Sequence, residues 1–414
     1  MPAAATSGAP PGAANALVDI RTGRTTTWAE LPDLELPAPA TVVAPSSFDA
    51  LPSVWAHART GAELLVVARG RMEESLRTEL LEGGFNVVEG DEMEPATAPR
   101  DPQQDRVWLL TSGSTGRPKR IGHTLASLTT VSGELAPRRW LCPYSPGTYA
   151  WWQVVTLGLG SPGQNLVVVD PSELEGWVAA AVEHGVTAAS GTPTFWRQTI
   201  MTHGDALAEV PLEQISLGGE PVDQAVLDQL TGLFPEARVS WIYASAELGA
   251  SIVVHDGRAG FPAEWLDRDA PGRPRLAVED GELVIASPHH GEGLDGAVRT
   301  GDAVLVEDGR VLITGRTSAD EINVGGAKVS AGAVRSALQS HPDVAWAHVR
   351  GRKAPLVGTM VVADVVLGSG ETSAPGTVSS ITRWCQERLP EYGVPRRIKL
   401  LDSIPQKETL KSDV

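Results

Sequence analysis

The sequence predicts an α/β protein in which β-sheets are flanked by helices, and three features of the chain lead to this prediction. Short apolar segments alternate with segments of helical periodicity over most of the 414 residues. Between residues 278 and 312 the pattern changes to closely spaced strands joined by Asp-Gly turns. A smaller unit with its own strands and helices begins after Arg316. A β-then-α rhythm favours parallel sheets covered by helices, whereas Asp-Gly turns favour antiparallel hairpins.

The individual elements follow from composition and periodicity, taken in chain order. Residues 1–46 are rich in Ala, Pro, Gly and Thr and show little periodicity, so we expect a loosely ordered start. Beyond it, apolar runs predict buried strands and amphipathic segments predict helices. Strands are predicted at residues 63–68, 107–110, 166–170 and 188–190, and helices at residues 73–81, 174–184 and 222–234.

Two hairpins and a C-terminal unit complete the predicted elements. The Asp-Gly pairs at residues 280–281 and 308–309 each lie between apolar segments, which is the pattern of a β-hairpin. In the smaller unit we expect a helix at residues 331–340, strands near Trp346 and Val361, and a helix at residues 377–389.

Composition and charge exclude several classes of protein. No apolar run is long enough to span a membrane, and the first residues lack the basic and apolar regions of a secretory signal. The only two cysteines, Cys142 and Cys385, fit a reducing cytoplasm, and we expect both to be small core residues. The formal net charge of −17 argues against nucleic acid as a partner.

A loop rich in hydroxyl groups and glycine follows the strand predicted at residues 107–110. Its two glycines allow backbone N–H groups to point toward one position, its hydroxyls add donors, and Lys119 adds a positive charge, which together suit a polyphosphate. It is not a P-loop, because that motif needs a lysine directly after its second glycine, whereas Lys119 comes three residues after Gly116. A plain Ser/Thr/Gly linker is the alternative.

This loop resembles the phosphate-binding signature of the adenylate-forming superfamily, which includes acyl-CoA synthetases, peptide-synthetase adenylation domains and firefly luciferase. Further stretches resemble the same superfamily in the same order, over about residues 105–414. They are Gly218-Gly219-Glu220-Pro221, Tyr243-Ala244-Ser245-Ala246-Glu247, Arg299-Thr300-Gly301-Asp302 followed by Gly315-Arg316, and the segments at residues 322–329 and 404–411. A single such stretch is weak evidence for membership of the superfamily, but the ordered series is strong evidence.

The resemblance implies both an architecture and an activity. The architecture is a large N-terminal domain, residues 1–316, made of helix-flanked sheets with a small β-barrel-like subdomain. A small mobile α+β C-terminal domain, residues 317–414, follows a hinge at residues 318–320. The activity is that of an ATP-dependent acid ligase, which forms an acyl-adenylate and passes the acyl group to the thiol of coenzyme A or of carrier-protein phosphopantetheine. Fewer residues than usual precede the phosphate loop, which implies a reduced first subdomain.

The resemblance also implies roles for individual residues. Glu247 would bind Mg²⁺, a hard cation that prefers carboxylate oxygen. Lys411 would stabilise the charge that develops between the carboxylate and the α-phosphate. Gly325 and Gly326 would line the tunnel of the acceptor. The residues implied in ATP binding are Thr111, Ser112, Gly113, Ser114, Thr115, Gly116 and Lys119 at the phosphates, Gly218, Gly219, Glu220 and Tyr243 at the adenine, and Asp302 and Arg316 at the ribose.

The chain departs from the family pattern at two positions beside these residues. Ala246 stands where Thr or Ser usually precedes the metal-binding glutamate, and Leu410 stands where glycine usually precedes the terminal lysine. Neither change removes a charged group, so we expect an active enzyme. The alternatives are a ligase that uses an amine acceptor or another oxyacid, and a degenerate nucleotide-binding protein.

The distribution of charged residues along the chain favours some acids and acceptors over others. No Asp or Glu lies between Glu134 and Asp170, where amino-acid-activating relatives carry an acid that pairs with the substrate ammonium. A buried ammonium without a partner is costly, so a neutral-tailed acyl or aryl acid is favoured over an α-amino acid. His123, His289 and His290 show no ligand spacing and receive no role.

The C-terminal part is mildly basic beside an acidic body. From Thr317 onward there are 12 Lys and Arg against 10 Asp and Glu, a net charge of +2, whereas the remainder has 22 against 41, a net charge of −19. Such a surface could receive an anionic acceptor such as coenzyme A or an acidic carrier protein, and an ordinary solvated surface is an equal alternative. The candidate cations are Arg350, Arg352, Lys353, Arg396, Arg397 and Lys399.

Overall fold

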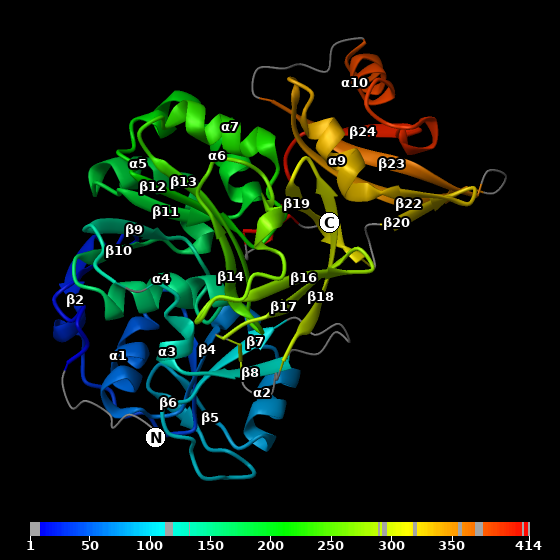
Figure 1. The fold of residues 1–414 in the computed structure, drawn as a ribbon. Helices are drawn as coiled ribbons and strands as arrows, with labels where there is room; N and C mark the ends of the chain where they lie inside the picture. The colour runs from blue at the N-terminus through cyan, green and yellow to red at the C-terminus, as the bar shows by residue number, and fades with distance from the viewer. Residues whose placement is uncertain are drawn as a thin grey trace.

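The structure is a computed structural model that describes residues 9–111, 119–131, 133–288, 290–291, 296–317, 321–354, 358–368, 376–407 and 410–412. The predicted hinge at residues 318–320 and His289 lie outside these residues. The described chain has the mixed α/β fold that the sequence predicts, with a separate C-terminal unit (Figure 1). We call residues 9–317 the large domain, residues 321–401 the small domain, and residues 402–412 the C-terminal tail.

An eight-stranded sheet forms the centre of the large domain. It is parallel except at its two edges, and its strand order is β14-β13-β12-β11-β9-β10-β1-β2. The strands are β1 (Ala16–Asp19), β2 (Arg24–Thr27), β9 (Arg138–Cys142), β10 (Gln164–Val168), β11 (Ala188–Gly191), β12 (Gln214–Gly218), β13 (Arg238–Ser245) and β14 (Gly249–Val254). The helices beside it are α4 (Tyr149–Gly160), α5 (Trp177–Glu183), α6 (Pro193–Ala208) and α7 (Gln224–Leu233).

A second sheet carries the strands on both sides of the predicted phosphate loop. It has six strands in the order β6-β5-β3-β4-β7-β8, parallel in its centre and antiparallel at both edges. The strands are β3 (Ala40–Ala44), β4 (Leu64–Ala68), β5 (Asn86–Glu89), β6 (Glu92–Glu94), β7 (Val107–Thr111) and β8 (Lys119–His123). The helices of this region are α1 (Leu51–Thr60), α2 (Glu74–Glu82) and α3 (Leu125–Leu128).

The expectation of a loosely ordered start is wrong for residues 9–46. β1 joins the central sheet beside β10, where Leu17 pairs in register with Leu166, and β3 lies inside the six-stranded sheet. Leu17 and Trp28 are completely buried. Strands of four or five residues give little local periodicity, and the partner that stabilises β1 lies far along the chain, so composition alone did not reveal them.

The Asp-Gly turns form the predicted hairpins of a five-stranded antiparallel subdomain. Asp280 and Gly281 have φ angles of +51° and +76°, and Asp308 and Gly309 have φ angles of +49° and +72°. Two successive positive φ angles match the twist of the flanking strands. The strands are β15 (Phe261–Pro262), β16 (Arg275–Glu279), β17 (Glu282–Ala286), β18 (Val298–Glu307) and β19 (Arg310–Arg316).

The small domain has a hydrophobic core of its own. In Figure 1 it lies at the upper right, in yellow to red, against β19 and α6 of the large domain. A hairpin leads into it, and two helices pack on one face of a three-stranded sheet in the order β22-β23-β24. Its elements are β20 (Glu321–Val324), β21 (Ala327–Ser330), α9 (Ala331–Gln339), β22 (Val344–Ala354), β23 (Gly358–Leu367), α10 (Thr377–Gln386) and β24 (Arg397–Leu401).

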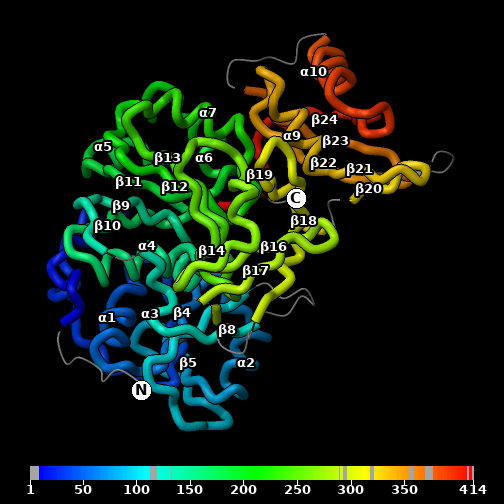
Figure 2. The backbone as a smooth tube through the Cα atoms, in the orientation of Figure 1, coloured from blue at the N-terminus to red at the C-terminus, as the bar shows by residue number. Residues whose placement is uncertain are grey.

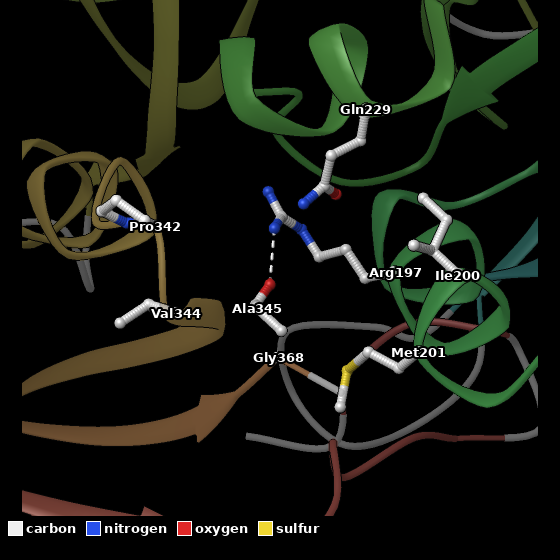
Figure 3. Close-up of a pocket in the computed structure, with 8 residues that line it drawn as sticks. All are labelled: Arg197, Ile200, Met201, Gln229, Pro342, Val344, Ala345 and Gly368. Atoms are coloured by element: carbon white, nitrogen blue, oxygen red, sulfur yellow. Dashed lines mark hydrogen bonds between the residues drawn. The ribbon is translucent and has the colours of Figure 1, made fainter. Parts of the chain in front are cut away.

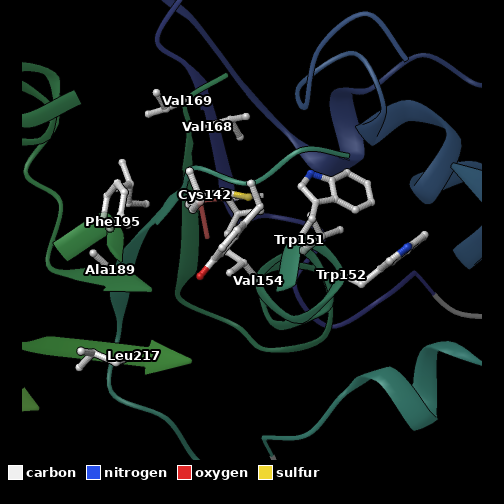
Figure 4. Close-up of a cluster of buried hydrophobic side chains, with 14 of the residues drawn as sticks. Cys142, Trp151, Trp152, Val154, Val168, Val169, Ala189, Phe195 and Leu217 are labelled. Atoms are coloured by element: carbon white, nitrogen blue, oxygen red, sulfur yellow. The ribbon is translucent and has the colours of Figure 1, made fainter. Parts of the chain in front are cut away.

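The core of the large domain contains the acid-free stretch between Glu134 and Asp170. Figure 4 shows Trp151 and Trp152 of α4 packed with Cys142 of β9 in a cluster of buried apolar side chains. Both thiols of the chain are buried, as predicted, and burial raises the pKa of Cys142 to about 12 and that of Cys385 to about 11. Among the described residues, none of the helices combines the length and hydrophobicity that crossing a membrane requires.

Candidate active site

The predicted phosphate loop connects two neighbouring strand ends. Thr111 ends β7 and Lys119 begins β8, and these two residues face each other in register across the antiparallel pair. The side chain of Lys119 is exposed. The residues between them that the sequence assigns to the phosphates, Ser112, Gly113, Ser114, Thr115 and Gly116, lie outside the described residues.

The two residues predicted at the ribose face each other on the small antiparallel subdomain. Asp302 of β18 pairs in register with Arg316 of β19, so their side chains share one face of the sheet. Arg316 Nε lies 3.3 Å from Asp302 Oδ1, and its Nη1 donates to the carbonyl of Thr300 at 2.7 Å. The pair presents a carboxylate that can accept from sugar hydroxyls beside a cation that can hold it in place.

Tyr243 links this pair to the central sheet. It lies on β13, and its hydroxyl donates to Asp302 Oδ2 at 2.5 Å. Burial raises the pKa of the Tyr243 hydroxyl, and the Asp302 carboxylate adds to this effect. Burial also raises the pKa of Asp302, while the Tyr243 hydrogen bond and Arg316 act in the opposite direction. Tyr243, predicted at the adenine, and Asp302, predicted at the ribose, are therefore joined by a hydrogen bond that the sequence did not predict.

Lys411 of the tail reaches the glycine loop that follows β12. Gly219 has a φ angle of +82°, and a Cβ built on it would lie 3.1 Å from Lys411 Cε and 3.7 Å from Nζ. Both the left-handed backbone and the close approach of Lys411 therefore favour glycine at this position. The structure thus brings the predicted catalytic lysine beside one of the predicted adenine-binding residues.

The ammonium of Lys411 lies among charges of both signs. Part of the side chain remains exposed, yet burial among protein atoms lowers the pKa of Lys411. The carboxylates of Glu220 and Asp302 act to raise that pKa, and the guanidinium of Arg316 acts to lower it. A phosphate anion bound here would favour the charged ammonium again.

Two side chains of the large domain hold the backbone on either side of Lys411. Thr192 donates its hydroxyl to the carbonyl of Leu410 and, as the N-cap of α6, accepts from Phe195 N. Glu220 Oε1 accepts from Ser412 N at 2.8 Å and from Ser412 Oγ at 3.0 Å. The sequence assigned Glu220 to adenine, whereas its carboxylate binds the tail in this arrangement.

Glu220 also fastens the first turn of α6. Its Oε2 accepts from Thr194 N at 3.0 Å, so the two carboxylate oxygens connect the helix N-terminus with the tail. Charge-assisted hydrogen bonds of this kind are stronger than neutral ones. The Thr-Pro pair at the beginning of α6 is a recognisable helix start in the sequence. The sequence around Thr192 and Glu220 does not predict that these side chains bind Leu410 and Ser412.

Leu410, which replaces the usual glycine, has a left-handed backbone and a buried side chain. Its φ angle is +63°, a conformation that costs a leucine about 1–2 kcal/mol. Its side chain is 1% exposed and belongs to the core of the large domain. Removing a buried leucine side chain typically costs about 2–5 kcal/mol, which exceeds the strain. Leu410 therefore anchors the tail despite its unfavourable φ angle.

We expect Leu410→Gly to lower the rate of adenylate formation about tenfold, because the lost burial exceeds the relieved strain by about 1.4 kcal/mol or more. Pyrophosphate release under saturating ATP measures this rate. Acyl transfer from a supplied adenylate is the internal control and is expected to stay unchanged. A Leu410→Gly variant that releases pyrophosphate as fast as the parent would contradict the anchoring role.

Glu247 lies in the turn between β13 and β14, and its backbone is held from two sides. His123 Nε2 lies 2.7 Å from the carbonyl of Ala246, to which it donates, and Gly291 N donates to the carbonyl of Glu247 at 2.8 Å. Burial lowers the pKa of His123, so the ring is neutral near pH 7. His123, which the sequence left without a role, supports the turn that carries Glu247.

The carboxylate of Glu247 fits a single-carboxylate magnesium site. Within the described residues the Glu247 carboxylate takes part in no hydrogen bond or ion pair. Mg²⁺ is commonly held by one or two carboxylates together with substrate phosphates and water. In the described part of the chain, no group of three or more His, Cys, Asp or Glu side chains could hold a metal by itself.

Gly325 and Gly326 form the exposed turn between β20 and β21, with φ angles of +60° and +95°. A Cβ at either position would meet no atom within 4 Å. The β20–β21 hairpin lies at one edge of the molecule, away from the strands of the central sheet (Figure 2). The present arrangement therefore does not bring these two glycines to Lys411.

Comparisons with known proteins identify the family of the chain. Residues 39–296 match the AMP-binding enzyme family, and residues 333–411 match the AMP-binding enzyme C-terminal domain. The fold is also similar to the crystal structure of the anthranilate CoA ligase AuaEII in complex with anthranoyl-AMP, with a TM-score of 0.73 and 16% identity, covering 96% of this chain and 92% of that chain.

Two curated relatives show similarity in sequence. The 2-succinylbenzoate–CoA ligase of Geobacillus kaustophilus (strain HTA426) is 28% identical over 286 residues, which are 61% of this chain and 54% of that protein. The fatty acid–[acyl-carrier-protein] ligase ScoC of Streptomyces coeruleorubidus is 26% identical over 341 residues, 72% of this chain and 64% of that protein. The alignments thus cover less than two thirds of either relative. Since residues 39–296 alone are more than half of the chain, the protein belongs to the AMP-binding, adenylate-forming enzyme family.

Proposed function

We propose that the protein is an ATP-dependent carboxylic acid ligase that forms an acyl-adenylate and then transfers the acyl group to a thiol. The main support is the position of Lys411, a cation of the C-terminal tail, beside Gly219 and close to the carboxylates of Glu220 and Asp302. Three segments that are far apart in sequence supply these groups, and all belong to the series that resembles the family. The thiol would be that of coenzyme A or of carrier-protein phosphopantetheine.

In the first half-reaction, a carboxylate oxygen of the acid attacks the α-phosphorus of ATP, and pyrophosphate leaves. Negative charge grows on the α-phosphate oxygens, and a cation fixed nearby stabilises the transition state more than the bound substrates. Lys411 would supply that cation. Asp302 would accept from the ribose hydroxyls, with Tyr243 and Arg316 holding its carboxylate in place.

Mg²⁺ bound at the phosphates would neutralise their charge and favour departure of pyrophosphate. Glu247 would hold it, while His123 and Gly291 fix the backbone of the turn that carries this glutamate. In the second half-reaction, the thiol sulfur attacks the acyl carbon and AMP leaves. Gly325 and Gly326 would line the path of the thiol after the small domain has turned.

We expect the acid to lack an α-amino group. Much of the acid-free stretch between Glu134 and Asp170, including Trp151 and Trp152, lies in the apolar core. The carboxylate of Glu220 already accepts hydrogen bonds on both of its oxygens. An ammonium bound nearby would therefore lack a free partner, at a cost of several kcal/mol. Pyrophosphate release should be at least tenfold faster with acyl or aryl acids than with the matching α-amino acids. Faster release with the amino acids would contradict this prediction.

A panel of carboxylic acids, assayed for pyrophosphate release with ATP and Mg²⁺, tests the proposed function. The best acid is then offered with coenzyme A, with a phosphopantetheinylated carrier protein and with a simple amine, and the products are identified by mass spectrometry. A thioester supports the proposal, whereas an amide would assign the acceptor to amines. Binding of ATP without pyrophosphate release from any acid would indicate a degenerate nucleotide-binding protein.

A further inference from the structure

Arg197 is a buried arginine that connects the two domains. It lies on α6 of the large domain and is 3% exposed. Its Nη1 donates to the carbonyl of Ala345 in β22 of the small domain at 2.6 Å (Figure 3). Its Nη2 donates to Asp223 Oδ2 at 2.5 Å. Asp223 is itself fixed as the N-cap of α7. Arg197 therefore joins a rigid carboxylate of one domain to a backbone group of the other.

The carbonyl of Ala345 is available because β22 contains a β-bulge. Val344 pairs with Leu367 and Trp346 pairs with Val366, so Ala345 is the extra residue that has no partner in the sheet. The extra residue of a bulge leaves its backbone groups outside the ladder. Arg197 supplies a hydrogen bond that the sheet does not provide, and a buried carbonyl without any donor would be costly.

The boundary between the domains is not completely filled by side chains beside Arg197. A cavity of about 200 Å³ lies beside it between the domains, and residues of both domains line it, including Gln229 and Pro342 (Figure 3). If the small domain moves away, Arg197 loses the Ala345 carbonyl but keeps Asp223 and gains water. The hydrogen bond between Arg197 and the Ala345 carbonyl therefore holds the domains together. It can still break, because Arg197 then keeps Asp223 as a partner.

The same helix carries the contacts that hold the tail. Thr192, the N-cap of α6, donates to the carbonyl of Leu410. Farther along the helix, Met201 packs against the buried cluster of Trp346, Val366 and Ile404. Arg197 lies between these positions. The same helix, α6, thus contacts both the small domain and the tail that carries Lys411, so we expect the two contacts to form together.

We infer that Arg197 is a positioning residue for adenylate formation, which holds the small domain in the arrangement that brings Lys411 to Gly219. The inference rests on the proposed function, because only the first half-reaction needs Lys411 in this position. Arg197 does not touch the reacting groups. It acts through the equilibrium between the docked arrangement and arrangements in which the small domain has turned away.

The test compares Arg197→Ala with Arg310→Ala. Arg310 is also a buried arginine, and it pairs with Asp256 at 2.7 Å, but both partners belong to the large domain. With the acid that gives the fastest pyrophosphate release, Arg197→Ala should lower adenylate formation about tenfold or more and leave transfer from the supplied acyl-adenylate to the thiol unchanged or faster. Arg197→Lys should restore only part of the loss, because lysine has no second nitrogen with which to bridge Asp223 and Ala345.

A distance measurement tests the inference without any activity. Cysteines introduced at exposed Met93 of the large domain and exposed Tyr392 of the small domain accept a fluorescent donor and acceptor. The native thiols, Cys142 and Cys385, are buried and have raised pKa values, so they react slowly. Arg197→Ala should shift the donor–acceptor distance distribution of the substrate-free protein, and Arg310→Ala should not.

The outcomes separate the inference from the proposed function. If no acid supports pyrophosphate release, the proposed function fails, and the distance distribution still decides whether Arg197 holds the domains. An unchanged distribution in Arg197→Ala overturns the inference. Equal losses in both half-reactions, matching those of Arg310→Ala, overturn it as well, because they would mean that Arg197 serves only the stability of the fold.

Discussion

Lys411→Ala is expected to lower the rate of adenylate formation about a hundred- to a thousandfold while leaving acyl transfer from a supplied acyl-adenylate intact. A fixed cation aimed at the charge of a transition state is worth about 3–4 kcal/mol, which corresponds to this change in rate. The side chain lies beside Gly219 and near Asp302, so it can meet an α-phosphate held there. Pyrophosphate release measures the first half-reaction, and thioester formation from synthetic adenylate measures the second.

Lys407→Ala is the matched control for this prediction. Lys407 lies on the same tail, is exposed, and donates its backbone N–H to the carbonyl of Lys411. Removing its charge should change neither half-reaction by more than about twofold, since exposed charges contribute little. Equal losses of both half-reactions in Lys411→Ala would make this lysine a structural or acceptor-binding residue. No loss in either would mean that another cation serves the adenylation step.

Glu247→Gln is expected to reduce turnover about a hundredfold at limiting Mg²⁺ and to weaken the apparent affinity for Mg²⁺. The substitution keeps the size of the side chain and removes the charge that a hard cation requires, a loss of about 3 kcal/mol in stabilisation of the phosphates. The backbone of the turn should survive, because His123 donates to the carbonyl of Ala246 and Gly291 donates to the carbonyl of Glu247.

Glu307→Gln provides the comparison for Glu247→Gln. It removes one carboxylate from the same domain at an exposed position at the end of β18, so it reproduces the change in net charge without touching the site. Both variants should melt at the same temperature as the parent. A Glu247→Gln variant with unchanged turnover over a titration of Mg²⁺ would show that the metal does not depend on this carboxylate.

The candidate site residues were predicted from the sequence because the prediction depends on residue type and order. Asp302 and Arg316 were predicted together, and the register of β18 with β19 explains why these two positions share a face. The Asp-Gly turns at residues 280–281 and 308–309 were equally clear, since a positive φ angle at two successive residues is a local requirement. In contrast, β1 was missed, because its four residues are stabilised by Leu166 and its neighbours in β10.

The sequence by itself determined the fold class, the hairpins and the set of charged groups that we propose to bind ATP. Only the tertiary structure decided how the domains meet. In the folded protein, the carboxylate of Glu220 accepts hydrogen bonds from Ser412, and Leu410 is buried at a φ angle suited to glycine. The carbonyl of Ala345, which has no partner in the sheet, accepts a hydrogen bond from Arg197. The hydrogen bonds that fix these positions join residues 148 to 218 positions apart, and they depend on the orientation of whole domains. Local propensity and residue spacing do not predict that orientation, because it arises from packing between surfaces that form only after each domain has folded.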